Sequence, residues 1–141
     1  MDSAAPAAAS MERLMVLLVE DSATNRFLIE AYLKQTPYQA DVAENGEIAV
    51  QKYMAGNYDL VLMDMQMPVM DGYTATRHIR RWESAHGRHP TPIIALTAHA
   101  LIEDVQKSLD AGCNAHLTKP VKKAALLETM DAYAKRGKAS R

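Results

Sequence analysis

The sequence predicts an α/β fold in which helices cover both faces of a parallel sheet. Short apolar runs alternate along the chain with segments in which apolar residues recur at helical spacing. These runs lack the polar alternation of half-exposed strands, so they are typical of strands buried on both faces. The length, 141 residues, suits one domain. Strict alternation of strands and helices therefore favours a single α/β sandwich.

The first strand is expected at residues 14–19, an apolar run that ends at two acids. The first helix should span residues 25–33, where apolar side chains recur three and four positions apart. Pro37 closes this helix, because proline cannot continue a helical segment. Residues 38–43 are then expected to form the second strand.

The next helix begins at Asn45 and Gly46, and the third strand, residues 60–63, stops at Asp64. The helix should present one apolar face, made of Ala49, Val50, Tyr53 and Met54. Proline and glycine then mark residues 65–72 as a loop. Its methionines are expected to be partly exposed and to meet a partner: Met65, Met67 and Met70.

The second half of the chain repeats the alternation. The fourth strand, residues 92–96, ends at Thr97, and the fifth, residues 115–118, ends at Lys119. Helices are expected before, between and after these two strands. Their inward residues should be Ala75, Ile79 and Trp82 in the first, Leu101, Val105 and Leu109 in the second, and Leu126, Leu127, Met130 and Tyr133 in the last.

Both ends of the chain are expected to lie outside the folded domain. Residues 1–10 are a low-complexity mixture dominated by alanine, which is typical of a flexible lead-in or linker. Residues 136–141 are basic and small, as expected of a flexible tail. Residues 11–135 then form the domain.

Composition argues against several classes of protein. Sixteen basic and seventeen acidic residues provide no net field for nucleic acid. Cys113, the single cysteine, cannot form an internal disulfide, which fits a reducing compartment. No apolar run approaches the roughly 18 residues of a membrane span, and the first residues lack the pattern of a signal peptide. A cytoplasmic location without membrane or nucleic-acid contact is expected.

Polar side chains follow four of the five predicted strands, at the point where each strand ends. They are Glu20 and Asp21, Asp64, Thr97 and Lys119. Because the carboxyl ends of parallel strands share one edge of a sheet, these side chains should converge. One such residue alone is more simply a turn former or a helix cap, but five of them favour a common site.

This combination of side chains favours phosphoryl chemistry. Crowded carboxylates repel one another, so they need compensating positive charge. Lys119 supplies one charge, and hard oxygen ligands without nearby histidine or cysteine favour Mg²⁺ over zinc. One carboxylate can then attack phosphorus and form an aspartyl phosphate. The Thr97 hydroxyl and the Lys119 ammonium would stabilise charge on the phosphoryl oxygens.

Four segments in this order, VLLVEDSATNR, LVLMDMQMPVMDG, IIALTA and HLTKP, resemble the receiver domain of two-component response regulators. They most resemble receivers fused to hybrid sensor histidine kinases, over nearly the whole predicted domain. The resemblance implies a flavodoxin-like fold with strand order 2-1-3-4-5 and a phosphoacceptor module in signalling. As an isolated domain it would catalyse only its own phosphorylation and dephosphorylation.

The resemblance also implies how Mg²⁺ and phosphate are held. Asp64 would accept the phosphoryl group from a phosphohistidine and would ligate Mg²⁺ together with Asp21. Glu20 would act through water, and the backbone carbonyl of Gln66 would complete the protein ligands. Lys119 would pair with the phosphoryl oxygens. In such domains the bond between this lysine and the following proline is cis, as only X-Pro bonds commonly are.

A conformational switch is implied as well. Thr97 would move toward the phosphate, and the side chain three positions before the lysine would turn inward. This side chain is usually Tyr or Phe, whereas here it is His116, a smaller ring that can titrate near neutral pH. A half-exposed residue on an edge strand is the alternative for His116. Gln66 and His99 occupy the positions at which the family tunes hydrolysis of the acyl phosphate.

The implied partners are a sensor histidine kinase, in cis or in trans, and a histidine phosphotransfer domain. The face that changes would be formed by the fourth helix, the fifth strand and the fifth helix. A stand-alone regulator and the receiver of a hybrid kinase both remain open, as does the direction of phosphate flow.

Two other classes of protein fit parts of the pattern. A phosphatase of the haloacid-dehalogenase type also forms an aspartyl phosphate, but it needs an acid where this chain has Gln66. A receiver-like platform that is never phosphorylated is the other alternative, and the presence of all five site residues argues against it. A nucleotide hydrolase is disfavoured because no P-loop sequence occurs.

Overall fold

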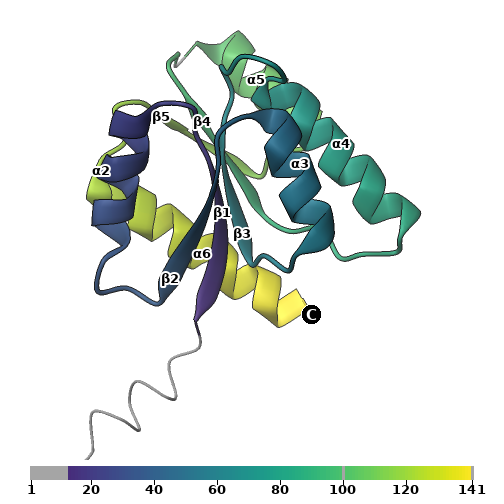
Figure 1. Ribbon diagram of the computed structural model, residues 1–141, viewed down its shortest axis with the longest axis horizontal. Helices are drawn as coiled ribbons and strands as arrows, with labels where there is room; N and C mark the ends of the chain where they lie inside the picture. Colours follow the sequence, from purple (N-terminus) through teal and green to yellow (C-terminus); the bar gives the residue numbers. More distant parts are fainter. Residues whose placement is uncertain (1–12, 100, 141) are drawn as a thin grey trace, which may run out of the picture.

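The computed structural model describes residues 13–99 and 101–140, without the side chains of residues 135–140. One sheet contains five parallel strands in the order β2-β1-β3-β4-β5, which confirms the predicted fold class (Figure 1). The strands are β1 (Leu14–Val19), β2 (Tyr38–Ala43), β3 (Leu60–Asp64), β4 (Ile93–Thr97) and β5 (Ala115–Thr118). The helices between and after them are α2 (Ala23–Leu33), α3 (Gly46–Ala55), α4 (Gly72–Ala85), α5 (Ile102–Ala111) and α6 (Lys123–Ser140).

The predicted ends of the domain have different outcomes. The lead-in expected at residues 1–10 lies outside the described residues. At the other end α6 continues through Ser140, so the boundary expected after residue 135 falls within this helix. No helix in the described ranges combines the length and the apolar character that crossing a membrane requires.

The sheet separates two apolar clusters. In β1, Leu17 and Val19 belong to one cluster, whereas Val16 and Leu18 belong to the other. This division follows from the pleat, which points successive side chains to opposite faces. Helices α3 and α4 cover the first cluster, and α2 and α6 cover the second (Figure 1). Burial on both faces accounts for the unbroken apolar runs in the sequence.

The predicted inward face of α5 is wrong for both of its leucines, whereas Val105 is half-buried. Leu101 is 61% exposed and Leu109 is 43% exposed. Leu101 is the N-cap residue rather than part of the helix, so it does not share the helical period. The helix instead buries the small side chains of Ser108 and Ala111. In α3 the predicted face is likewise too wide, because Met54 is 42% exposed.

Helices α2, α3 and α4 start with side-chain caps, which fix where the chain turns after each strand. Ser22, Asn45 and Asp71 each accept a hydrogen bond from the backbone N–H three residues later. This arrangement satisfies donors that a helix start leaves without partners. Helix α2 therefore begins directly after the acidic pair that ends β1, and the first turn of α4 lies close to the end of β3.

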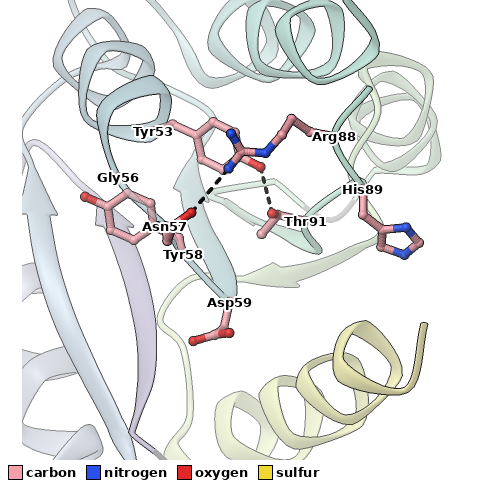
Figure 2. Close-up of a pocket in the computed structure, with 8 residues that line it drawn as sticks. All are labelled: Tyr53, Gly56, Asn57, Tyr58, Asp59, Arg88, His89 and Thr91. Atoms are coloured by element: carbon pink, nitrogen blue, oxygen red, sulfur yellow. Dashed lines mark hydrogen bonds between the residues drawn. The ribbon is translucent and has the colours of Figure 1, made fainter. Parts of the chain in front are cut away.

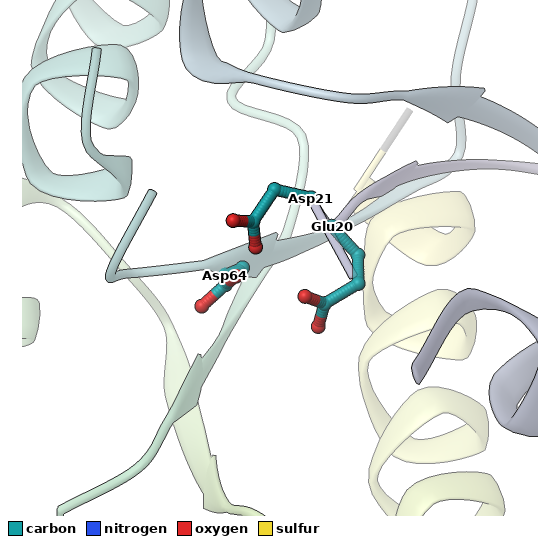
Figure 3. A group of neighbouring side chains, drawn as sticks. All are labelled: Glu20, Asp21 and Asp64. Carbon is teal, nitrogen blue, oxygen red and sulfur yellow. The ribbon is translucent and has the colours of Figure 1, made fainter. Parts of the chain in front are cut away.

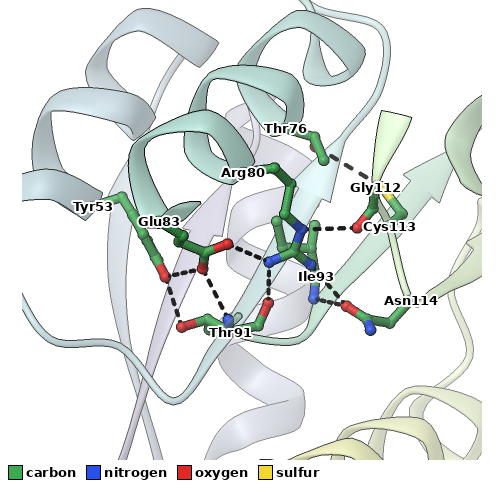
Figure 4. Close-up of polar contacts among 9 residues, drawn as sticks. All are labelled: Tyr53, Thr76, Arg80, Glu83, Thr91, Ile93, Gly112, Cys113 and Asn114. Carbon is green, nitrogen blue, oxygen red and sulfur yellow. Dashed lines mark hydrogen bonds and ion pairs between the residues drawn. The ribbon is translucent and has the colours of Figure 1, made fainter. Parts of the chain in front are cut away.

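A buried polar network joins α4 to its neighbours (Figure 4). Glu83 is 2% exposed and accepts hydrogen bonds from the Tyr53 hydroxyl and from the Thr91 N–H at 2.9 Å. Arg80 donates to Glu83 at 2.8 Å and to the carbonyl of Gly112 at 3.0 Å. This network could not be predicted from the sequence, because a glutamate in a helix rich in polar residues has the pattern of a solvated side chain.

Candidate functional site

Three carboxylates meet at the carboxyl edge of the sheet. Glu20 and Asp21 directly follow β1, and Asp64 is the last residue of β3. Each offers one carboxylate oxygen, and these oxygens all lie within 4.8 Å of one another (Figure 3). Residues 44 positions apart are adjacent because β1 and β3 are neighbouring parallel strands. The convergence predicted from the strand ends is therefore present.

Lys119 lies between two of these carboxylates. Its Nζ is 2.9 Å from Glu20 Oε1 and 3.0 Å from Asp64 Oδ1. Glu20 is 0% exposed and Asp64 is 1% exposed, so both charges are shielded from water. Asp64 Oδ2 is also buried, and within the described part of the chain it has no hydrogen-bond partner. The single ammonium group of Lys119 thus forms ion pairs with two buried acids, and among the described residues Asp64 Oδ2 has no partner.

This burial changes the protonation of the site. The pKa of Asp64 is raised to about 7, chiefly because the carboxyl group is buried; the neighbouring Glu20 also raises this pKa, while Lys119 lowers it. Burial acts to lower the pKa of Lys119, but its contacts with Glu20 and Asp64 outweigh burial, so the pKa of Lys119 is raised. The ammonium of Lys119 therefore stays charged. Any further positive charge near Asp64 would favour the ionised form of its carboxyl group.

The backbone of the acidic pair is held from α2. Arg26 donates from Nη1 to the carbonyl of Glu20 at 2.9 Å and to that of Asp21 at 3.1 Å. The N–H of Ser22 donates to Glu20 Oε2 at 3.2 Å. Arg26 is not among the site residues predicted from the sequence, although an arginine in the helix that directly follows two acids is a usable signal. These contacts fix the turn from which both carboxylates project.

The donor set fits a divalent cation such as Mg²⁺. Every candidate ligand is a hard oxygen, and Mg²⁺ commonly binds one or two carboxylates while keeping several waters. Asp21 is exposed and leaves one side of the cluster open to solvent, whereas Asp64 Oδ2 is a buried oxygen that lacks a partner among the described residues. The cluster therefore offers both the charge and the open side that such an ion requires.

Thr97 is the last residue of β4 and is fully buried. Its Oγ1 donates to the carbonyl of His99 and accepts from the N–H of His99, both at 3.0 Å. Gln66 lies in the loop after β3, and its Oε1 accepts a hydrogen bond from the N–H of Ala98 at 3.3 Å. The loops after β3 and β4 are thus in direct contact. The Thr97 hydroxyl is bonded to His99, in the loop that follows β4.

His116 lies on β5 beside Ala95 of β4, and it is half-buried. The structure therefore places it at an intermediate depth and leaves both interpretations of this residue open. The bond between Lys119 and Pro120 is cis, as the resemblance implied. The N–H of Lys119 donates to the carbonyl of Thr97 at 2.7 Å, so these two predicted site residues are also joined through the backbone.

The prediction for Met65 is wrong, because this side chain is fully buried. The N–H of Met65 donates to the carbonyl of Leu96 at 3.0 Å, so hydrogen bonding with β4 continues one residue past Asp64. The side chain consequently packs in the cluster under α3 and α4. Met67 and Met70 are partly buried, and Val69 is the exposed apolar residue of this loop, at 77%.

The structure also has a polar cavity of about 330 Å³ (Figure 2). It lies where α3 leads into β3 and where α4 leads into β4, which is the edge of the sheet opposite the acidic cluster. The cavity is lined by Tyr53, Gly56, Asn57, Tyr58, Asp59, Arg88, His89 and Thr91. None of these was predicted as a site residue, so the cavity and the acidic cluster are separate features.

Comparison with protein families gives a match over residues 16–131 to the response regulator receiver domain. The sensor histidine kinase GacS of Pseudomonas protegens is 38% identical over 115 residues, which cover 82% of this chain and 12% of GacS. Hybrid signal transduction histidine kinase M of Dictyostelium discoideum is 38% identical over 117 residues, which cover 82% of this chain and 5% of that protein. The chain thus spans a small fraction of the length of these relatives.

Solved structures give the same result. The receiver domain of a sensor histidine kinase from Pseudomonas aeruginosa, with a magnesium ion coordinated in its active-site cleft, has 41% sequence identity and a TM-score of 0.78. That match covers 86% of this chain and 98% of the other. The receiver domain of a Saccharomyces cerevisiae response regulator, solved with a histidine phosphotransfer signalling protein, has 34% identity and a TM-score of 0.83. That match covers 87% of this chain and 90% of the yeast chain.

Proposed function

This chain belongs to the response regulator receiver domain family, and from that premise we propose that Asp64 is its phosphoacceptor. Receiver domains of this kind act in two-component and phosphorelay signalling. The observation that carries the assignment to Asp64 is its contact with Lys119 beside the acidic pair, where one of its carboxylate oxygens is buried and lacks a partner among the described residues. That oxygen is available to a metal ion or to phosphorus.

The ligands for Mg²⁺ would be Asp21 and Asp64, with Glu20 acting through water and the backbone carbonyl of Gln66 completing the protein set. When bound, the ion would neutralise the carboxylates and the incoming phosphoryl group. The magnesium in the similar Pseudomonas receiver and the oxygen-only cluster of this chain support the assignment. Arg26 keeps the backbone of the acidic pair in place for this role.

In the proposed reaction the carboxylate of Asp64 attacks a phosphohistidine. An O–P bond forms to Asp64 while the N–P bond breaks, and the histidine leaves as neutral imidazole with the proton of its other nitrogen. Lys119, already 3.0 Å from Asp64 Oδ1, stabilises charge on the phosphoryl oxygens. Thr97 donates to another phosphoryl oxygen once its hydroxyl has left the carbonyl of His99.

The partners we propose are a sensor histidine kinase, in cis or in trans, and a histidine phosphotransfer domain. The histidine kinases among the relatives and the yeast receiver solved with a phosphotransfer protein support this choice. The surface of α5, β5 and α6 would change on phosphorylation, with His116 as the residue that turns. These partners and the single cysteine fit a cytoplasmic setting.

The test is incubation with Mg²⁺ and acetyl phosphate, followed by mass spectrometry of the intact protein. We expect an adduct of one phosphate in the wild type and in Glu30→Gln, a control for an exposed acid on α2. Asp64→Asn should carry no adduct. An unmodified wild-type protein that hydrolyses many phosphate esters would instead support a phosphatase, and an adduct that persists in Asp64→Asn would assign the acceptor to another residue.

A further inference from the structure

Gln66 contacts both Asp64 and the loop after β4. Its backbone N–H donates to Asp64 Oδ1 at 3.2 Å. Its side-chain Oε1 accepts from the N–H of Ala98 at 3.3 Å. The backbone contact reaches the predicted phosphoacceptor, and the side-chain contact reaches the residue that follows Thr97. One residue therefore connects the acceptor with the loop that has to move.

The second observation concerns the single hydroxyl proton of Thr97. A threonine hydroxyl can donate only one hydrogen bond, and here it donates to the carbonyl of His99. The same oxygen accepts from the N–H of His99, so the loop is closed on itself. Thr97 cannot donate to a phosphoryl oxygen in this arrangement. In the conformation that Gln66 stabilises, the Thr97 hydroxyl is therefore not available as a hydrogen-bond donor to a phosphoryl group.

We infer that the Gln66 side chain is a latch that favours the unphosphorylated conformation of the loop after β4. This inference rests on the proposed function of Asp64. The contact between Gln66 and Ala98 stabilises the loop while the Thr97 proton is used within it. When Asp64 carries a phosphoryl group, the oxygen that accepts from the Gln66 N–H no longer belongs to a carboxylate, and the contact of the Gln66 side chain with Ala98 is released as Thr97 turns to the phosphate. Gln66 acts here as a positioning residue.

The latch predicts tighter binding of a phosphoryl mimic when the hydrogen-bond acceptor on the Gln66 side chain is removed. Gln66→Met keeps a similar volume and removes the amide oxygen, so the closed loop loses one hydrogen bond. A neutral hydrogen bond contributes a modest net stability, which corresponds to a change of about two- to tenfold in an equilibrium constant. With Mg²⁺, the half-saturating concentration of beryllofluoride, a phosphoryl mimic, should fall by about that factor.

The experiment measures two quantities in wild type, Gln66→Met, Gln66→Glu and Gln51→Met. The first is the hydrogen-exchange rate of the Ala98 amide in the unphosphorylated protein, followed by NMR. The second is the beryllofluoride concentration that half-saturates the protein in the presence of Mg²⁺. Gln51→Met makes the same change at an exposed position on α3. Gln66→Glu retains a carboxylate oxygen that can accept from Ala98.

The expected result is faster exchange of the Ala98 amide and tighter beryllofluoride binding in Gln66→Met, with neither change in Gln51→Met. Gln66→Glu should keep the slow exchange of wild type. Unchanged exchange in Gln66→Met, or unchanged or weaker beryllofluoride binding, overturns the latch. If wild type bound no beryllofluoride, the role of Asp64 would fail, and the exchange of Ala98 would still decide whether Gln66 holds the loop.

Discussion

At the scale of single residues, Asp64 shows how a functional group can cost stability. Its side chain is 1% exposed, faces two other acids, and has one oxygen without a partner in the described ranges. We expect Asp64→Asn to raise the free energy of unfolding by about 1–3 kcal/mol without divalent cations. The substitution removes a buried charge and keeps a side chain of almost the same size. Urea denaturation in the presence of a chelator measures the change.

Glu30→Gln, on an exposed surface, is the control and should leave the free energy of unfolding within about 0.5 kcal/mol of the wild-type value. An Asp64→Asn protein that is less stable than wild type would contradict the cost of the buried charge.

Val69 is a second residue whose conformation has a cost. It is 77% exposed and has a φ of 72°, which a β-branched residue rarely adopts. The N–H of Met70 donates to the carbonyl of Pro68 at 2.8 Å and closes a tight turn around it. Val69→Asn should increase the free energy of unfolding by about 1 kcal/mol, because asparagine tolerates positive φ.

Thermal or chemical denaturation tests this change. Gln35→Asn is the matched comparison, since Gln35 also has a positive φ but lacks the branched Cβ. Its gain in stability should be smaller than that of Val69→Asn. Equal gains at both positions would mean that β-branching contributes nothing to the strain at Val69.

At the scale of secondary-structure elements, Gly72 lets the start of α4 lie against the end of β3. A Cβ at this position would be 2.3 Å from the carbonyl oxygen of Asp64 and 2.8 Å from the Cα of Met65. Gly72→Ala should therefore displace backbone beside Asp64, the proposed phosphoacceptor, and cost about 1–3 kcal/mol of stability. Denaturation measures the loss, and the acetyl phosphate reaction should slow as well.

Gly87→Ala separates steric contact from backbone strain. Gly87 has a φ of 62° and no atom within 4 Å of an added Cβ. The cost at Gly87 comes from φ alone, so phosphorylation should proceed as in wild type. If Gly87→Ala and Gly72→Ala slowed phosphorylation equally, the close approach at Gly72 would not explain the effect.

The network around Glu83 holds α3, α4 and β4 together, and Tyr53 gives it a pH signature. The pKa of Tyr53 is raised to about 12, chiefly because the hydroxyl is buried and also because it donates a hydrogen bond to Glu83, while the hydrogen bond to Thr91 opposes the change. An unfolded tyrosine ionises near pH 10.0. The contribution of Tyr53 to the free energy of unfolding is therefore fully present below pH 10 and is lost as the pH rises toward 12.

The test is Tyr53→Phe, compared with wild type by denaturation below pH 10 and between pH 10 and 12. The variant should be less stable at neutral pH, because Glu83 loses a donor. Its stability should then decline less across the alkaline range, by about 1–2 kcal/mol. Tyr38 and Tyr58 remain in both proteins, so the difference isolates Tyr53. Parallel alkaline curves would contradict this role.

At the scale of the whole molecule, the proposed magnesium site would couple ion binding to folding. Its carboxylates come from separate strand ends, so the site exists only in the folded chain. Mg²⁺ at 100 times its dissociation constant should stabilise the protein by about 2.7 kcal/mol. A thermal-melting series in Mg²⁺, matched with NaCl at equal ionic strength, measures the shift.

Asp21→Asn provides the matched variant, because this side chain is exposed and its loss opens no cavity. The variant should fold normally and lose most of the stabilisation by Mg²⁺. A melting temperature that rises equally in wild type, in Asp21→Asn and in NaCl would show that ionic strength, rather than the cluster, is responsible.

Much of the fold and of the candidate site could be predicted because both depend on local pattern. Apolar runs such as residues 60–63 identify strands buried on both faces, and the polar residue that ends each run lies at a common edge whatever the connecting helices do. The juxtaposition of Asp64 with Asp21 and Lys119 follows from this rule, and the structure shows it.

The errors occur where burial depends on a neighbouring element. Leu109 satisfies the helical period but is 43% exposed, since α5 packs through its small residues. Met65 lies in a loop by its sequence but is buried, since it remains hydrogen-bonded to β4. Periodicity shows that a helix has an apolar stripe, and it does not show how much of the stripe another element covers.

The sequence by itself determined the class of the fold, the order of its elements and the acids and lysine that share one edge, because strand ends in a parallel sheet have only one place to meet. The tertiary structure alone decided how polar atoms are paired: the Thr97 hydroxyl with His99, Gln66 with both Asp64 and Ala98, and Glu83 with Tyr53 and Thr91. A hydrogen bond requires its two atoms within about 3 Å at a suitable angle. Such positions depend on how loops and helices pack, which no spacing along the chain specifies.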